Sequence, residues 1–301
     1  MHPSNRCMHQ AENCTVKQSE SGQKLLSFLR RKLGRSFPPS ALMRLIRTGQ
    51  VRVNKGRCKP FDRVFTDDTV RIPPCFKTPD AVPDCSGQID IVYETENFLA
   101  LNKPRSLPVH PGTDHRDSLV CRVLASCPGN GFTPTPVHRL DKNTTGLILF
   151  AKSYTWLIEM QNMWNSRAVR KTYLTWVKGS WQGGSGQLKD RLYRQQDKVR
   201  VNHQGKQSSS RVTPISVWQD MSLLQVQLNT GRKHQIRVQL AARGHPVVGD
   251  TKYGGEHTGS NMMFLHCFEI SWPEHSLTVA PDWSGKFSIP SGVNSGQERN
   301  P

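Results

Sequence analysis

The segment HRLDKNTTGLILFA, residues 138–151, decides how this chain is organised. Its last five residues are apolar and predict a buried strand. A short polar turn precedes that strand, and Asp141 lies in the turn. A carboxylate held beside a rigid strand and near the surface is well placed to do chemistry. The segment therefore predicts a sheet with a candidate reactive acid at its edge.

Two interpretations of Asp141 are open. Arg139 and Lys142 flank it, and nearby cations would keep a carboxylate ionised, as a nucleophile requires. The alternative is a turn residue that bonds the backbone of Asn143 or Thr144, which is a common role for Asp. The spacing alone favours the turn.

Patterns on both sides of this segment are those of an α+β protein. Residues 89–94 alternate as in a strand, residues 98–102 form another apolar run, and short strands continue to about residue 290. Helical patterns interrupt them at 117–126, 153–165 and 232–243. Because strands and helices do not alternate regularly, we predict an α+β fold and not a parallel α/β sheet.

The stretch 229–240 begins with a turn and continues into an amphipathic pattern. Arg232, Lys233, His234 and Arg237 gather near its start. Cations at a helix start can hold phosphate, and an arginine can pair with a carboxylate. The alternative is a solvated basic helix end. A further candidate is Tyr173, which could stack on a base or could simply occupy a half-buried strand.

The region from residue 22 to residue 74 predicts a small basic module. Two short helices are followed by a hairpin, and Arg44, Arg47, Arg52 and Lys55 fall outside the apolar stripes. The order of these features resembles the S4 domain, a small RNA-binding fold. That resemblance implies that the four cations contact RNA, whereas charge alone leaves a solvated basic surface as the alternative.

The charge balance favours a polyanionic partner. The chain has 41 Lys and Arg residues against 23 Asp and Glu, a formal net charge of +18. Residues 1–80 alone carry 16 basic and 6 acidic residues, so about a quarter of the chain holds more than half of the surplus. Nucleic acid is the first candidate. No apolar run approaches the roughly 20 residues that span a bilayer, and none resembles a signal peptide.

The eight cysteines form no Cys-x-x-Cys pair. Their scattered spacing predicts free thiols in a reducing compartment, hence a cytoplasmic protein, and no metal site. From composition we predict these boundaries: a flexible tail at 1–20, the S4-like domain at 21–75, a linker at 76–88, the main domain at 89–290 and a second tail at 291–301. The Gly-rich residues 179–187 predict a mobile loop.

The order of the motifs is more specific than any one of them. The series resembles the RluA family of pseudouridine synthases over residues 89–290, and the module in front makes the chain similar to the subgroup that modifies large-subunit ribosomal RNA. The matching stretches are Lys103-Pro104, 109–112, 138–141 with 144–146, 171–174, 230–237, 244–250 and 252–254.

This resemblance implies a mixed, mainly antiparallel sheet with a central cleft, and it implies roles. Asp141 would be the nucleophile, Tyr173 would stack on the target uracil and help to handle its proton, and Arg237 would pair with Asp141. Arg139 would contact RNA and fill the gap left by a flipped nucleotide, and Arg232, Lys233 and His234 would hold RNA. Lys142-Asn143 and Gln239 depart from the usual pattern, which leaves neighbouring RNA contacts open.

The implied reaction needs no cofactor, because an isomerisation oxidises nothing and imports no group. The expected partner is large-subunit ribosomal RNA, and a monomer is the default. A different class of function stays open: a noncatalytic RNA-binding or ribosome-assembly factor, for which Asp141 would not matter. A methyltransferase would need a Gly-rich nucleotide turn after a strand, and we find no convincing one. If the catalytic interpretation holds, Tyr173 and Arg237 must converge on Asp141 in an open, positive cleft.

Overall fold

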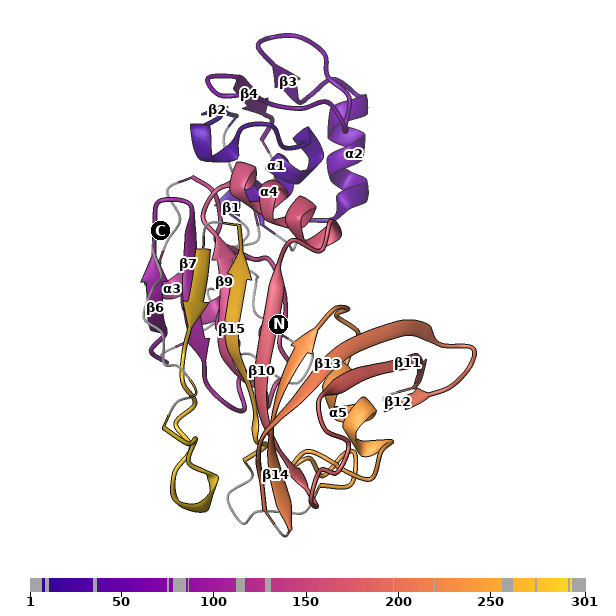
Figure 1. The fold of residues 1–301 in the computed structure, drawn as a ribbon. Coiled ribbons are helices and arrows are strands. Elements are labelled where there is room, and N and C mark those ends of the chain that lie inside the picture. The colour runs from indigo at the N-terminus through magenta and orange to yellow at the C-terminus, as the bar shows by residue number, and fades with distance from the viewer. Residues whose placement is uncertain are drawn as a thin grey trace, which may run out of the picture.

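The computed structural model describes residues 7–8, 11–34, 37–74, 76–77, 85, 87–111, 117–127, 131–196, 198–218, 220–255, 262–273, 275–291 and 293. A small N-terminal unit lies at one end of a large sheet, against helix α4 (Figure 1). The sheet divides into two parts that meet at strand β10, and one part curves away from the other (Figure 1).

In the described part of the chain, the large sheet has eleven strands. Nine follow one another in the order β12-β11-β13-β14-β10-β15-β9-β7-β6, with β16 paired to β15 and β8 paired to β9. The strands are β6 (Asp90–Glu94), β7 (Phe98–Lys103), β8 (Thr135–Pro136), β9 (Thr145–Ala151), β10 (Arg170–Lys178), β11 (Gly186–Gln195), β12 (Lys198–Val201), β13 (Lys206–Val217), β14 (Met221–Leu228), β15 (Leu265–Trp272) and β16 (His275–Thr278).

Among the described strands of this sheet, β9 and β15 pair in parallel and the other neighbours are antiparallel. The prediction of an α+β fold with a mixed, mainly antiparallel sheet is therefore confirmed. The run Leu147–Ala151 forms the inner part of β9 and is fully buried, because β9 lies inside the sheet and has core on both faces.

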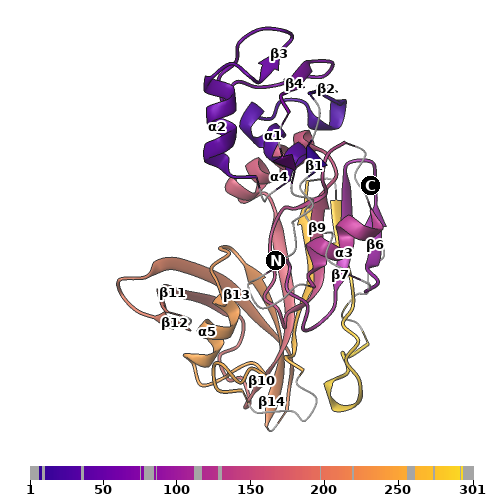
Figure 2. The ribbon, with the colours of Figure 1, turned by 180° about the vertical axis from the view of Figure 1, so that it is seen from behind.

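Three helices accompany the sheet close to their predicted positions: α3 (Leu119–Ser126), α4 (Tyr154–Asn165) and α5 (Gln235–Ala241). Ser118 and Ser153 begin the first two as N-caps, each accepting a backbone N–H of the first turn. Figure 2 shows α3 on the face of the sheet that Figure 1 hides. The third helix starts later than predicted, at Gln235, so three of the predicted cations lie in the turn before it.

The N-terminal unit is built from β2 (Glu12–Thr15), η1 (Gln18–Glu20), α1 (Leu25–Leu33), α2 (Pro39–Arg47), β3 (Arg52–Val53) and β4 (Thr69–Ile72). The three strands form a small antiparallel sheet in the order β2-β4-β3. Apolar residues of both helices and of β4 make a separate small core. The predicted order of two helices and then a hairpin-rich sheet matches this arrangement.

The prediction of a flexible tail at 1–20 is wrong for residues 11–20. Strand β2 pairs with β4, and Val16 is completely buried in the small core. Glu20 is buried as well, where its carboxylate forms an ion pair with Lys32 at 3.0 Å. The strand is only four residues long and mostly exposed, so it leaves no hydrophobic pattern in the sequence.

Contacts fix the N-terminal unit against the main sheet. The guanidinium of Arg31 in α1 stacks on the ring of Phe132 at 4.3 Å, and its Nη1 donates to Thr135 Oγ1 at 3.0 Å. Phe132 is fully buried, so the contact joins the helix to the edge of the main core. Cation–π and hydrogen-bonding contacts of this kind favour one docked arrangement of the two units.

Other boundary predictions fall mainly outside the described residues, including most of 76–88 and nearly all of 291–301. Among the residues that the structure does describe, β1 (Cys7–Met8) and β5 (Phe76–Lys77) pair with each other.

The prediction of eight free thiols is wrong for one pair: Cys85 and Cys121 form a disulfide across Cα atoms 6.1 Å apart. Their distance along the chain, 36 residues, gave no sign of it. Among the described helices, none has the length and apolar character needed to cross a membrane.

Candidate active site

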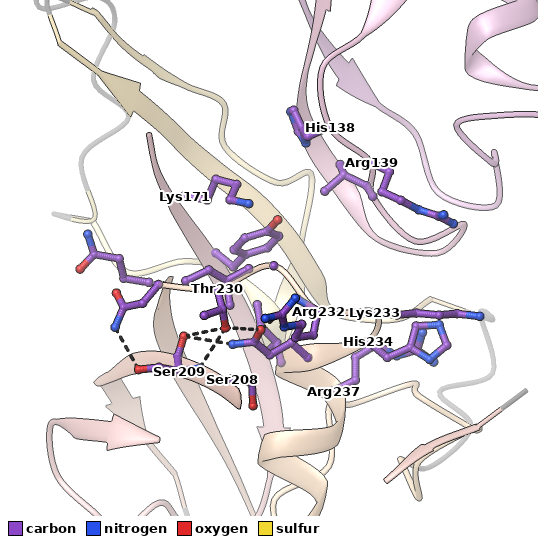
Figure 3. Close-up of a pocket in the computed structure, with 18 of the residues that line it drawn as sticks. His138, Arg139, Lys171, Ser208, Ser209, Thr230, Arg232, Lys233, His234 and Arg237 are labelled. Carbon is purple, nitrogen blue, oxygen red and sulfur yellow. Dashed lines mark hydrogen bonds between the residues drawn. The ribbon is translucent and has the colours of Figure 1, made fainter. Parts of the chain in front are cut away.

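A cleft of about 1430 Å³ opens where the two parts of the sheet meet. The turn before β9, strands β10, β11, β13 and β14, and the start of α5 line it. Figure 3 shows Arg139 on one side and Arg232, Lys233 and His234 on another. The acidic lining residues are Asp141 and Asp190, and the basic ones besides histidine are Arg139, Arg167, Arg170, Lys171, Lys189, Arg191, Arg232, Lys233 and Arg237. The cleft is therefore strongly positive.

The turn that carries Asp141 is held at the start of β9. The backbone N–H of Thr144 donates to the Asp141 carbonyl oxygen at 3.1 Å, which closes the turn. Two residues later Gly146 has φ +101°, and a Cβ there would lie 2.3 Å from the carbonyl oxygen of Cys267 in β15. Only glycine lets β9 approach β15 this closely. That approach sets where the Asp141 turn emerges from the sheet.

Lys103, the last residue of β7, ties the Asp141 turn to a neighbouring loop. Its ammonium donates to the carbonyl oxygens of Pro104 at 2.7 Å, Leu107 at 2.9 Å and Lys142 at 2.9 Å. Three acceptors match the three donors of an ammonium group. Burial lowers the pKa of Lys103 to about 7, and the negative charge of Asp141 partly offsets this decrease. Sequence analysis included Lys103 in a family motif but predicted no role for it.

Arg237 joins two carboxylates. Its Nη1 donates to Asp141 Oδ2 at 3.1 Å, while Nε and Nη2 donate to the two oxygens of Asp250, each at 2.7 Å. Burial disfavours the charge on Arg237, but the hydrogen bonds and charge of Asp250, helped by Asp141, outweigh it and raise the arginine pKa. The guanidinium is therefore a fixed cation whose position is set by Asp250.

Asp250 follows a glycine that cannot be replaced without moving the backbone. Gly249 has φ +80°, and a Cβ there would meet the carbonyl oxygen of Met262 at 1.8 Å. The Lys252 backbone N–H also donates to Asp250 Oδ1, at 3.2 Å. Asp250 is thus held from both sides, and it is the member of this cluster that sequence analysis missed. The sequence did contain a signal for Asp250: it is an acid directly after Gly249 within the motif 244–250.

His234 precedes α5 in a left-handed conformation, with φ 54°. Its Nδ1 shares a hydrogen bond with Tyr253 Oη at 2.7 Å, and its Nε2 lies 3.7 Å from Asp141 Oδ2. Burial lowers its pKa to about 4, an effect that Asp141 opposes and Arg237 reinforces. A neutral ring in this position is less suited to phosphate than the sequence suggested.

Tyr173 lies on β10 at the floor of the cleft, opposite Cys267 of β15. Burial raises the pKa of its phenol well above the usual value, and Cys267 and Asp141 add to the effect. The Cys267 thiol is also buried, which raises its pKa to about 12. Both groups therefore keep their protons at neutral pH.

The cleft brings together seven of the predicted site residues: Asp141, Tyr173, Arg237, Arg139, Arg232, Lys233 and His234 all line it. The convergence that the catalytic interpretation requires is present. The other four lie in the N-terminal unit and do not line the cleft. There Arg44, Arg47 and Lys55 are exposed, while Arg52 is half-buried and donates to the carbonyl oxygens of Gly49 and Lys55. In the part of the chain that the structure describes, no group of His, Cys, Asp and Glu could hold a metal ion.

Comparisons with known proteins identify the family. The model of the RNA pseudouridylate synthase family matches residues 97–242. Ribosomal large subunit pseudouridine synthase C of Pasteurella multocida is 34% identical over 284 residues, 88% of this chain and 86% of that protein. The protein of the same name from Escherichia coli (strain K12) is 33% identical over 275 residues, 84% of this chain and 86% of that protein.

A solved structure of human RNA pseudouridylate synthase domain containing 1 aligns with a TM-score of 0.53 and 26% identity, over 68% of this chain and 86% of that one. The chain belongs to the RNA pseudouridylate synthase family. It is an RNA pseudouridine synthase, an isomerase of the RluA type, as the order of its motifs predicted.

Proposed function

We propose that this enzyme converts uridines of large-subunit ribosomal RNA to pseudouridine, with Asp141 as the nucleophile. The observation that carries the proposal is the 3.1 Å hydrogen bond from Arg237 to Asp141 Oδ2 inside a basic cleft. The substrate class follows from the relatives, which are named as synthases of the ribosomal large subunit. Family membership alone does not select these residues or this RNA.

The proposed reaction breaks the bond between uracil N1 and ribose C1′, turns the base, and joins C5 to C1′. The proton lost from C5 balances the one gained at N1, so the product has the same atoms as the substrate. As the nucleophile, the Asp141 carboxylate forms a transient bond to the nucleoside while the N1–C1′ bond breaks, and this bond is released again when C5 joins C1′. Arg237 holds that carboxylate aimed through a charge-assisted hydrogen bond. No cofactor is proposed, since nothing is oxidised and no group is imported.

Tyr173 is proposed to pack on the target uracil. Because its surroundings keep the phenol protonated, it can offer a face and a hydrogen-bond donor more readily than it can act as a base. Burial favours this role, since the ring is already fixed and loses little further conformational entropy when a base stacks on it. A role in the proton transfer would therefore be donation to the displaced base.

RNA contacts are assigned to the exposed cations of the cleft. Arg139 lies two residues before Asp141 and is exposed, so its side chain can enter the space that a flipped nucleotide vacates. Arg232 and Lys233 are exposed in the turn before α5 and can bind phosphates. We expect a smaller contribution from His234, whose ring is mostly buried and neutral.

The N-terminal unit is proposed to be an S4-like RNA-binding domain spanning about residues 11–74, followed by a linker to the catalytic domain. Support comes from its two-helix and small-sheet arrangement and from its exposed cations. Replacing both Arg44 and Arg47 with Glu should weaken ribosomal RNA binding and make the affinity less sensitive to salt. The slope should fall by about 0.9 for each duplex phosphate that the protein no longer neutralises. An unchanged slope in a salt titration would exclude this surface from RNA binding.

We also propose that the enzyme acts as a monomer in the cytoplasm. The ribosomal assignment of the relatives supports this location. Light scattering at assay concentration would give the mass of one chain. A stable dimer would refute the monomer.

The decisive experiment compares wild type with Asp141→Asn on unmodified large-subunit ribosomal RNA, followed by mapping of pseudouridine. Wild type should modify specific uridines, and the variant should lose about 10⁴-fold or more of the rate, since a nucleophile has no substitute. RNA binding should stay within about threefold, because Asn keeps the shape. Equal activity of the two proteins would refute the role of Asp141. A wild type that modifies only another RNA would refute the substrate.

A further inference from the structure

The hairpin of β11 and β12, together with β13, forms an arm that projects from the main sheet on the side of α5 (Figures 1 and 2). In a strand, alternate residues point to opposite faces. On β11 the residues Lys189, Arg191 and Tyr193 therefore share one face, and Leu188 and Leu192 share the other. Lys189 and Arg191 line the catalytic cleft, as does their neighbour Asp190, and Leu192 on the second face packs against α5, so the first face is the one left open beside the cleft.

The second face of the arm packs in part against the protein itself. Leu192 and Val199 pack with Val238 of α5, and Tyr253 lies against this small cluster. The Tyr253 hydroxyl accepts the backbone N–H of Val199 at 3.1 Å, which ties β12 to the loop that carries Asp250. The arm is therefore anchored through this face, and these contacts leave its cleft-side face uncovered.

The cleft-side face combines an exposed ring with cations. Tyr193 is 43% exposed and pairs across the hairpin with Arg200, so ring and guanidinium lie side by side on the same face. Further along β11, Arg191 faces Gln207 and Lys189 faces Ser209, and both of these polar partners also line the cleft. The face runs without interruption from Tyr193 into the catalytic cleft.

The one acid described on β11 does not weaken this positive face. Asp190 also lines the cleft, but its carboxylate is already paired: Gln239 Nε2 donates to it at 2.7 Å and Arg243 Nη1 at 3.0 Å. Gln239 is itself fixed by the Ser210 hydroxyl, which donates to its amide oxygen at 2.9 Å. The departure of Gln239 from the usual family residue thus coincides with a network that pairs the charge of this acid.

We propose that this face of the arm binds the single-stranded RNA that flanks the target uridine, with Tyr193 stacking on an unpaired base and Arg200 and Arg191 contacting phosphates. The inference rests on the proposed function and assigns it a binding surface that extends from the cleft along the arm. A base offers its face to an aromatic ring only when it is unstacked, which favours single-stranded RNA over a duplex. An acidic peptide would use the cations but would not need the ring.

The test measures the affinity of the full chain for a labelled single-stranded oligouridylate of roughly 12 nucleotides and for a duplex of the same length. Tyr193→Ala should weaken single-strand binding about 5- to 150-fold, as loss of one base stack predicts, and Tyr193→Phe should retain it. Trp218→Ala is the matched control, because Trp218 is 44% exposed and does not line the cleft.

Charge is tested separately. Arg200→Gln should reduce the slope of log affinity against log salt by about 0.7, the value for one phosphate contact to a single strand. Lys286→Gln, which removes an exposed cation elsewhere, should leave the slope unchanged. On a ribosomal RNA substrate, Tyr193→Ala should raise KM and leave kcat near wild type, since the ring does not touch the reacting base.

Two results would overturn the inference: wild-type affinity in Tyr193→Ala, or an equal loss for single strand and duplex. Neither result depends on catalysis. If instead wild type and Asp141→Asn were equally inactive on ribosomal RNA while Tyr193→Ala still lost single-strand affinity, the arm would stand and the proposed function would fail. Loss of kcat in Tyr193→Ala without loss of affinity would also refute the arm as a binding surface.

Discussion

The Asp141 turn and the Asp250 loop reach the same guanidinium in different ways. Asp250 is 1% exposed and binds Arg237 through both oxygens at 2.7 Å. Asp141 is 22% exposed and receives one bond at 3.1 Å, with both Arg237 and His234 directed at Oδ2. One carboxylate fixes the arginine, and the other is aimed by it while its Oδ1 is engaged by neither cation. Position and reactivity are thus divided between two acids.

The largest effect on stability is expected from removing the shared cation. Arg237→Met should leave Asp250 as a buried, uncompensated charge and lower the free energy of unfolding by about 3 to 5 kcal/mol. It should also reduce the single-turnover rate about 10²- to 10³-fold, because Asp141 loses its aiming partner. Urea unfolding and a single-turnover assay measure the two effects. A stable, fully active Arg237→Met variant would refute the claim that Arg237 connects Asp250 to Asp141.

The two carboxylates can then be compared directly. Asp250→Asn should lower the free energy of unfolding by about 2 to 4 kcal/mol, since an amide cannot match the bidentate, buried pair. Asp141→Asn should change it by less than about 1 kcal/mol, because that side chain is partly exposed and its charge is screened. The rates should fall in the opposite order, most for Asp141. Equal destabilisation by the two substitutions would remove the distinction between them.

The sequence predicted the elements of this site better than its connections. The turn before a buried strand located Asp141, and the order of motifs located Tyr173 and Arg237. Asp250 and Lys103 stood in recognised motifs, yet their tasks depend on which backbone comes close in space. A pairing across 13 residues, or three carbonyl groups around one ammonium, leaves no periodic pattern in a sequence.

The same limit explains the errors elsewhere. Strand β2 was missed because a short, exposed strand has no alternation of apolar residues to detect. The helix α5 was predicted too early because a basic, amphipathic run continues through the turn before it, where His234 takes a left-handed conformation. Backbone conformation at a single non-glycine residue is set by tertiary contacts, here the bond from His234 to Tyr253.

A smaller effect is expected when the cation is kept but its shape is changed. Arg237→Lys retains a positive charge, but a single ammonium cannot bind Asp250 through two parallel bonds and still reach Asp141. We expect the rate to fall about 10- to 100-fold and stability to fall by about 1 to 2 kcal/mol, between wild type and Arg237→Met. Stability equal to wild type would mean that the fork geometry is unimportant.

The smallest effect concerns pH and His234, whose ring lies beside Asp141. Burial lowers the pKa of His234 to about 4, so the unfolded chain, with a histidine pKa near 6.5, binds more protons between these values. The contribution of His234 to stability is therefore complete above about pH 6.5 and is lost as the pH falls toward 4. His138 and His266, with pKa values lowered by burial to about 3 and about 4, act in the same direction.

His234→Asn should flatten this acid-side decline by roughly 1 kcal/mol per pH unit, which is the part due to one proton. The measurement is the free energy of unfolding by urea at several pH values from 4 to 7. His203→Asn, at an exposed position, is the control and should keep the full slope. If His234→Asn kept it too, the ring would be titrating as it does in the unfolded chain. The contact between His234 and Asp141 would then join two solvated groups, and His234 would not belong to the buried cluster of Arg237 and Asp250.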